Sequence, residues 1–152
     1  MRFRGRAVAV AMAVAAVAAA CGGGDGGGDR LTKEQYIAEA DAICADINEQ
    51  LDALGEPGNL EEVAELAESA VGIQEEALEK LRALQPPEAD EATLNEAYEL
   101  LDQQVVLGNE IADAARDGDA ASITAIIGQL EGIDNQADQI AIDYGLTECG
   151  TD

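Results

Sequence analysis

Apolar residues recur at steps of three and four along four stretches of this chain, which is the spacing of one face of an α-helix. The first stretch opens at Thr32, which forms a predicted capping box with Gln35, and it stops at the Gly-Glu-Pro-Gly sequence of residues 55–58. The second opens at Asn59, a predicted N-cap, and stops at the proline pair of residues 86–87. Both stretches are therefore predicted to be helices with defined ends.

Two further helices are predicted in the second half of the chain. One begins near Asp90 and closes at the Arg-Asp-Gly-Asp sequence of residues 116–119. The other is capped by Asp119 and ends at Gly145, a residue type that closes many helices. No segment alternates with a period of two or is rich in β-branched and aromatic residues, as a strand would be.

Short connections between helices favour antiparallel neighbours, so residues 31–152 are predicted to form an all-α, antiparallel up-down-up-down four-helix bundle. Its core combines alanine with leucine and isoleucine and lacks Phe and Trp, which should let the helices approach closely. The positions predicted to face the core are Ile37, Ala40, Cys44, Ile47, Leu51, Leu54, Val63, Leu66, Ala70, Ala77, Leu81, Leu84, Leu94, Tyr98, Leu101, Val105, Ile111, Ala115, Ile123, Ile126, Leu130, Ile133, Ala137, Ile140 and Tyr144.

The first 20 residues have the three regions of a secretory signal. Three arginines within residues 1–6 precede a purely apolar stretch from Ala7 to Ala20, whose last residues are small enough for a signal peptidase. As a helix, this stretch would span only about 21 Å, which is short of the roughly 30 Å hydrocarbon core of a bilayer. A cleaved signal is therefore favoured over a permanent transmembrane helix.

The sequence that ends at Cys21 resembles a bacterial lipobox, in which the cysteine receives a diacylglyceryl group and becomes the mature N-terminus. Ala18 stands where leucine is most frequent in lipoboxes. Residues 22–29 contain only glycine and aspartate and should behave as a random coil of about 15 Å r.m.s. length. We predict a signal peptide at 1–20, a lipidated cysteine and tether at 21–30, and the bundle at 31–152. Ordinary cleavage after Ala20, without lipidation, is the alternative.

The charge balance limits the partners of the chain. It has 32 acidic and 8 basic residues, and removal of the predicted signal takes three arginines and no acid, which leaves a net charge of −27. Nucleic acid is excluded as a partner because phosphate contacts need clustered Lys and Arg. Anionic headgroups should repel the domain, so acyl chains such as palmitate must hold it. The predicted location is the extracytoplasmic face of the cell membrane.

Lipidation of Cys21 would leave Cys44 and Cys149 to form a disulfide. Cys44 faces the predicted core about eleven residues into the first helix, roughly 17 Å from its start. The five residues that end at Cys149 can reach back about 16 Å, and export exposes the chain to an oxidising compartment. The link would be worth on the order of 4 kcal/mol. A buried, free Cys44 is the alternative.

Three segments resemble those of small, alanine-rich actinobacterial lipoproteins. They are the start of the first helix at residues 31–48, the stretch around the proline pair at residues 84–92, and the end of the chain at residues 144–150. The resemblance covers most of the chain after the predicted signal. It implies a helical fold and a location at the membrane through a lipid anchor, and it assigns no active-site residue.

Several chemistries lack the residues that they need. The sequence has no His and no Trp, and both Met residues and the single Phe lie within residues 1–20. Haem, copper, His-based zinc and di-iron sites are therefore not expected, nor is Ser-His-Asp or Cys-His catalysis. The Gly-rich residues 22–29 carry acids and lack the Gly-Lys-Ser/Thr of a phosphate loop. We predict a protein that is not an enzyme, with no catalytic residue, no cofactor and no metal site.

Two groups of residues remain as candidates for binding, and the first is acidic. Hard cations such as Ca²⁺ prefer several oxygen ligands, but the spacing of an EF-hand is missing, so a solvated face is the simpler interpretation. The acidic positions are Glu61, Glu62, Glu65, Glu68, Glu75, Glu76, Glu79, Asp113, Asp117 and Asp119.

The second candidate group comprises all three tyrosines, Tyr36, Tyr98 and Tyr144, which the predicted topology places at one end of the bundle. A tyrosine buries its ring and keeps its hydroxyl for a partner. These residues either close the core with their hydroxyls in water or surround a small pocket with a polar rim at the membrane-proximal end. Gln74 also interrupts the apolar face of the second helix, as a residue at the edge of the core would.

These observations favour a lipid-anchored, extracytoplasmic, non-catalytic module that binds a protein or a small molecule. The alternative is an acidic surface protein that binds divalent cations.

Overall fold

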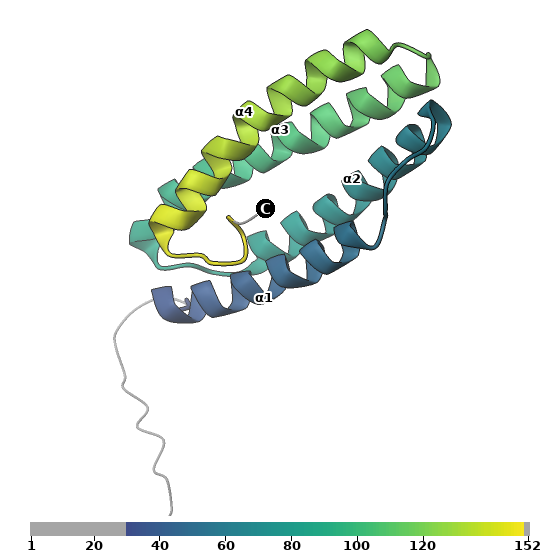
Figure 1. Ribbon diagram of the computed structural model, residues 1–152. Helices are drawn as coiled ribbons and strands as arrows, with labels where there is room; N and C mark the ends of the chain where they lie inside the picture. Colours follow the sequence, from purple (N-terminus) through teal and green to yellow (C-terminus); the bar gives the residue numbers. More distant parts are fainter. Residues whose placement is uncertain (1–29, 151–152) are drawn as a thin grey trace, which may run out of the picture.

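The computed structural model describes residues 30–150, which form four long helices joined by short connections (Figure 1). The elements are α1 (Lys33–Asp52), α2 (Leu60–Ala83), the short 3-10 helix η1 (Glu88–Asp90), α3 (Glu91–Arg116) and α4 (Ala120–Tyr144). Consecutive helices are antiparallel neighbours, since α2 packs against α1 and α3, and α3 packs against α4. The predicted all-α, up-down-up-down bundle is confirmed. The predicted signal, the lipidated Cys21 and the tether up to residue 29 lie outside the described residues.

The helices begin at the predicted capping residues. Thr32 and Gln35 form the capping box of α1, in which each side chain accepts a hydrogen bond from the backbone amide of the other residue, at 3.2 Å and 2.9 Å. Asn59 and Asp119 cap α2 and α4 by accepting from the amide three residues later. These bonds satisfy amides that have no partner inside the first helical turn.

Gly145 ends α4 and turns the chain back toward the core. Its φ of 106° lies in the left-handed region, which glycine adopts without strain. The amide of Leu146 then donates to the carbonyl of Ala141 at 2.9 Å, and that of Gly145 donates to Ile142 at 3.0 Å, as in a Schellman motif. Because Leu146 is buried, this turn directs the end of the chain onto the bundle.

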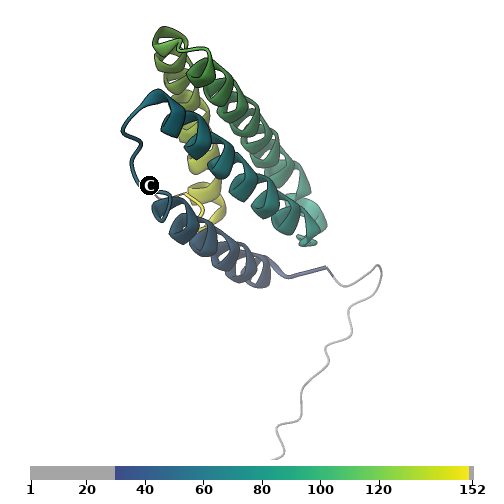
Figure 2. The same ribbon diagram turned by 90° about the vertical axis from the view of Figure 1, so that its right-hand side faces the viewer.

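The bundle is open between α1 and α4. No Cα atom of α1 lies within 8 Å of a Cα atom of α4. Residues 145–150, here named the C-terminal strap, lie between the two helices (Figures 1 and 2). At its far end the strap packs on α4, because a Cβ added to Gly150 would lie 3.1 Å from the Asp138 carbonyl oxygen. The strap therefore fills the space between α1 and α4 beyond the tyrosine end, where Tyr36 and Tyr144 join the two helices directly.

The core consists of two clusters of buried residues, one toward each end of the bundle. The larger cluster lies where α1 begins and includes the three tyrosines and Leu146 of the strap. The smaller cluster lies at the opposite end and is formed by Ala64 of α2, Ala115 of α3 and Ile123 of α4. The end of the bundle with the tyrosines is named the tyrosine end below.

The first half of α2 turns a different face to the core from the one predicted. Its buried positions are Ala64, Ala67 and Val71, each one residue after the predicted Val63, Leu66 and Ala70, which are half-buried. The connection of residues 53–59 replaces α1 at this level, so α2 packs there against α3 and α4 (Figure 1). Ala64 and Ala67 are smaller than the predicted Val63 and Leu66, whereas the buried Val71 is larger than Ala70.

Gly108 allows α2 and α3 to approach each other closely. A Cβ atom added to Gly108 would lie 2.6 Å from Cγ2 of Val71, a distance that Cβ atoms do not adopt. Valine is branched at Cβ and has little freedom to move away inside a helix. This contact is an example of the close helix approach expected from the small core residues.

We predict that Gly108→Ala destabilises the domain by about 1–3 kcal/mol, because the added methyl group overpacks the α2–α3 contact. Gly72→Ala is the matched control, since it lies in α2 with nothing within 4 Å of the added Cβ atom. It should stabilise the domain by up to about 1 kcal/mol through helix propensity. Urea denaturation measures both effects. Equal shifts for the two variants would contradict a close contact at Gly108.

Candidate functional site

A cavity of about 360 Å³ lies inside the bundle, and all four helices and the strap contribute to its wall. Alkyl side chains such as those of Leu51, Leu78 and Leu101 form much of the lining. Small-molecule sites are mostly apolar and measure about 300–1,000 Å³, so this cavity is the candidate functional site. Apart from two tyrosines, its polar side chains are Asn48, Gln74, Gln104, Asp134, Asp138 and Glu148.

Tyr36 and Tyr98 line the cavity at the tyrosine end, and their hydroxyl groups are hydrogen-bonded to each other. The two oxygens are 2.5 Å apart, and the Tyr98 hydroxyl donates to the Leu81 carbonyl oxygen at 3.1 Å. Tyr36 is therefore the donor in the bond between the two hydroxyls. The Leu81 carbonyl belongs to the last turn of α2 and also accepts from the Leu84 amide at 3.1 Å, so Tyr98 is its second donor.

Burial changes the acid–base behaviour of both hydroxyls. It raises the pKa of Tyr36 well above its usual value, and the hydrogen bond with Tyr98 raises this pKa further. Burial also raises the pKa of Tyr98, although the hydrogen bond with Tyr36 and the nearby Arg82 act in the opposite direction. Both groups therefore remain protonated over the ordinary pH range, and their hydroxyls are occupied inside the protein.

Tyr144 lies beside this pair but does not line the cavity. Its ring packs edge-on against Tyr36 with the ring centroids 5.7 Å apart, and its hydroxyl donates to Asp90 at 2.9 Å. Burial, followed by this hydrogen bond, raises the pKa of Tyr144. The structure thus brings all three tyrosines together. The cavity extends from Tyr36 and Tyr98 toward the middle of the bundle instead of lying among the three rings.

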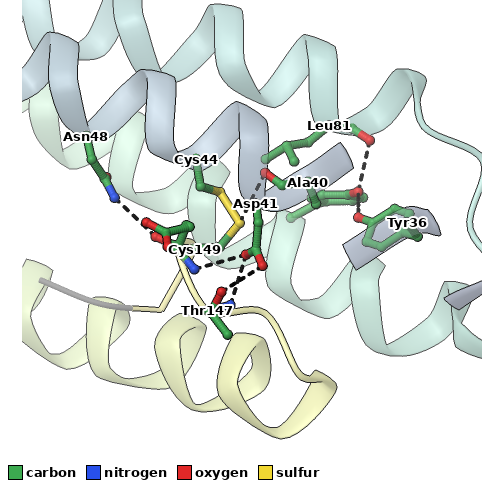
Figure 3. The surroundings of a disulfide bond; sticks show 10 residues. Tyr36, Ala40, Asp41, Cys44, Asn48, Leu81, Thr147 and Cys149 are labelled. Atoms are coloured by element: carbon green, nitrogen blue, oxygen red, sulfur yellow. Dashed lines mark hydrogen bonds between the residues drawn. A yellow bond between two sulfur atoms is a disulfide. The ribbon is translucent and has the colours of Figure 1, made fainter. Parts of the chain in front are cut away.

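The strap is fixed to α1 by a disulfide between Cys44 and Cys149, whose Cα atoms are 5.1 Å apart (Figure 3). The predicted pairing is confirmed. The Cys149 sulfur also lies 3.6 Å from the Ala40 carbonyl oxygen, and because a disulfide sulfur has no proton to donate, this contact is packing. The bond links positions 105 residues apart, a separation for which chain entropy gives about 4–5 kcal/mol of stabilisation.

Asp41 of α1 provides a second attachment for the strap (Figure 3). Its carboxylate accepts three hydrogen bonds of 2.9 Å, from the amide and hydroxyl of Thr147 and from the amide of Glu148. Two helical turns further on, Asn48 donates to the Glu148 carbonyl oxygen at 3.1 Å. These bonds place Glu148 and Cys149 at the edge of the cavity.

Gln104 is a site residue that the sequence analysis missed. Its side chain is only 6% exposed, and its amide donates to the Asp134 carboxylate at 2.8 Å across α3 and α4. The sequence predicts that Val105 faces the core at this point of α3, because its side chain is apolar. In the structure, Val105 is only half-buried. The sequence feature that indicates the burial of Gln104 is its position three residues after Leu101, on the helical face that also carries Tyr98.

The described part of the chain has a large excess of negative charge. Residues 30–150 contain 29 acidic and five basic residues. Four of the basic residues form ion pairs with carboxylates, as Arg116 does with Glu68, and Lys33 lies 4.2 Å above the Tyr144 ring. The described residues that line the cavity include acidic side chains but neither Lys nor Arg.

The acidic positions do not form a metal site in the described chain. Within residues 30–150, no three His, Cys, Asp or Glu side chains are placed to hold one metal ion.

The same residues include no helix that is long and apolar enough to span a membrane. The cavity is therefore the feature of this part of the chain that best fits a binding function.

Comparison of the sequence and the structure with protein-family models, curated proteins and solved structures finds no significant match. The candidate site is defined by its geometry.

The raised pKa of Tyr36 predicts that stability decreases at high pH. An unfolded tyrosine loses its proton near pH 10, whereas the folded Tyr36 keeps it, so above pH 10 the unfolded state binds fewer protons. The contribution of Tyr36 to the free energy of unfolding is therefore complete below pH 10. Above pH 10 it falls by at most about 1.4 kcal/mol per pH unit. Melting temperatures from pH 8 to 11 should drop less steeply for Tyr36→Phe than for the unchanged protein. Parallel curves would contradict this assignment.

Proposed function

We propose that this protein is a lipid-anchored, extracytoplasmic binding module that holds a small molecule in the cavity inside the bundle. The observation that carries the proposal is the cavity itself, with a volume of about 360 Å³ and mainly apolar walls. Its wall also carries a few polar side chains, which range from the buried Gln104 to the exposed Glu148. This combination is typical of sites that enclose an apolar ligand and orient it by a few polar contacts.

The chemistry of the lining supports binding without catalysis. The sequence contains no His, and Cys44 and Cys149 form a disulfide, so neither has a free thiol. The hydroxyls of Tyr36 and Tyr98 hydrogen-bond inside the protein, and burial raises both pKa values. General acid–base catalysis needs a group whose pKa lies near the working pH, which these tyrosines are not. The proposed module therefore binds its ligand unchanged.

The position of Arg30 supports the proposed orientation at the membrane. Arg30 donates to the Pro86 carbonyl oxygen at 2.9 Å and pairs with Glu91 at 2.6 Å, beside the connection between α2 and α3. The described chain therefore starts at the tyrosine end, so a tether attached through Cys21 would place that end nearest the membrane. The resemblance to alanine-rich actinobacterial lipoproteins also implies attachment to the membrane through a lipid.

We predict that the cavity binds 1-aminoanthracene, a neutral fluorescent probe whose emission increases in apolar surroundings. Ala137→Leu on α4, and independently Ala97→Leu on α3, should weaken this binding at least tenfold by filling the cavity. Ala125→Leu is the matched control, because this alanine is exposed on α4 and should bind as the unchanged protein does. Circular dichroism verifies that each variant is helical.

A titration without a saturable rise in fluorescence would overturn the proposed site. Undiminished binding by both folded cavity variants would also overturn it, because the probe would then bind elsewhere.

We predict for the anchor that Cys21→Ala moves the full-length protein from the membrane fraction of expressing bacteria into the medium, or blocks processing of the signal. Gly22→Ala keeps the cysteine and should remain membrane-bound as the control. Fractionation followed by mass spectrometry of the N-terminus measures both location and acylation. Membrane retention of the processed Cys21→Ala protein would contradict lipid anchoring.

A further inference from the structure

We propose that the ligand of the cavity is an amphiphilic cation, a small molecule with an apolar body and one ammonium-type positive charge. This inference rests on the proposed function of the cavity and adds the chemical class of its ligand.

The deep part of the cavity suits the apolar body. At the tyrosine end its wall includes Ala40, Leu81, Leu94 and Ala141, all at most 7% exposed. Within residues 30–150, no fully buried side-chain nitrogen or oxygen lacks a hydrogen-bond partner. A polar ligand group in this part would therefore lose its water without gaining a hydrogen bond from an orphaned side chain, which is unfavourable.

The middle of the cavity suits the positive charge. Asp134 and Asp138 lie one turn apart on the same face of α4, both are half-buried, and both line the cavity. Gln104 holds the Asp134 carboxylate from the opposite side through its 2.8 Å hydrogen bond. Glu148 adds a third acidic side chain from the strap. The acidic side chains of the lining thus come from α4 before Ala141 and from the strap.

The acidic side chains of the cavity favour a ligand with a positive charge. Partly buried carboxylates are screened by salt less than exposed ones, and they interact more strongly with a charge held in a medium of low dielectric constant. The lining residues within 30–150 include no base that would attract an anion. A bare metal ion fits less well, since the apolar walls would remain unused and no three ligands converge. Charge complementarity therefore favours an organic cation.

Three probes that share an octyl chain test the ligand class: octyltrimethylammonium, octanol and octyl sulfate. Displacement of 1-aminoanthracene measures their affinities at 0.15 M salt, where the general field of the acidic surface is screened beyond about 8 Å. We expect the ammonium probe to bind at least tenfold more tightly than octanol, and octyl sulfate to bind most weakly.

Paired variants identify the carboxylates responsible. Asp134→Asn with Asp138→Asn keeps an oxygen acceptor for Gln104 and should weaken ammonium binding at least tenfold while leaving octanol binding unchanged. Glu131→Gln with Asp143→Asn is the matched control, because it removes the same charge from exposed positions of α4 outside the cavity. The control should bind the ammonium probe as the unchanged protein does.

Each other result has a distinct meaning. Equal affinity for octanol and the ammonium probe would overturn the cationic ligand and leave the proposed binding function intact. Equal weakening by both double variants would also overturn it, because the general acidic surface would then be responsible. If none of the probes, 1-aminoanthracene included, binds the unchanged protein, the proposed function itself fails.

Discussion

The attachment of the C-terminal strap to α1 determines the shape of this domain. The backbone of α1 lies close to that of α2 alone, and α1 reaches α3 and α4 through side chains at the tyrosine end, where Tyr36 contacts Tyr98 and Tyr144. The Cys44–Cys149 disulfide and the three hydrogen bonds to Asp41 connect the open side through residues 145–150. Without these bonds, α1 would be held by its packing on α2, by its two ends and by the contacts of Tyr36 at one end of the bundle. The strap also forms part of the cavity wall, together with residues of all four helices.

The sequence predicts those parts of the structure that depend on local signals. Helix ends follow from capping residues such as Asn59 and from Gly145, because each satisfies backbone groups a few residues away. The disulfide follows from helix geometry and the reach of a short segment. The buried face in the first half of α2 and the role of Gln104 depend instead on where α1 ends and how far α4 lies from it. Those distances belong to the tertiary packing, so periodicity does not predict them.

The tyrosines show how a prediction can place residues well without giving their role. Topology brings Tyr36, Tyr98 and Tyr144 to one end of the bundle. The two roles considered from the sequence leave their hydroxyls to water or to the rim of a pocket. In the structure, the Tyr98 hydroxyl instead donates to the Leu81 carbonyl in the last turn of α2, and the Tyr144 hydroxyl donates to Asp90. The polar part of the cavity lies further along the bundle, at side chains whose neighbours are fixed only by the fold.

The span of the disulfide has a consequence for proteolysis. All three connections between the helices, at residues 53–59, 84–90 and 117–119, lie between Cys44 and Cys149. A protease that cuts any one of them produces two fragments that remain covalently joined. Because the part of the chain that would carry the lipid precedes Cys44, the distal fragment also remains attached to it. A nicked molecule would therefore keep all four helices on the same anchor, and their packing could persist after the backbone is cut.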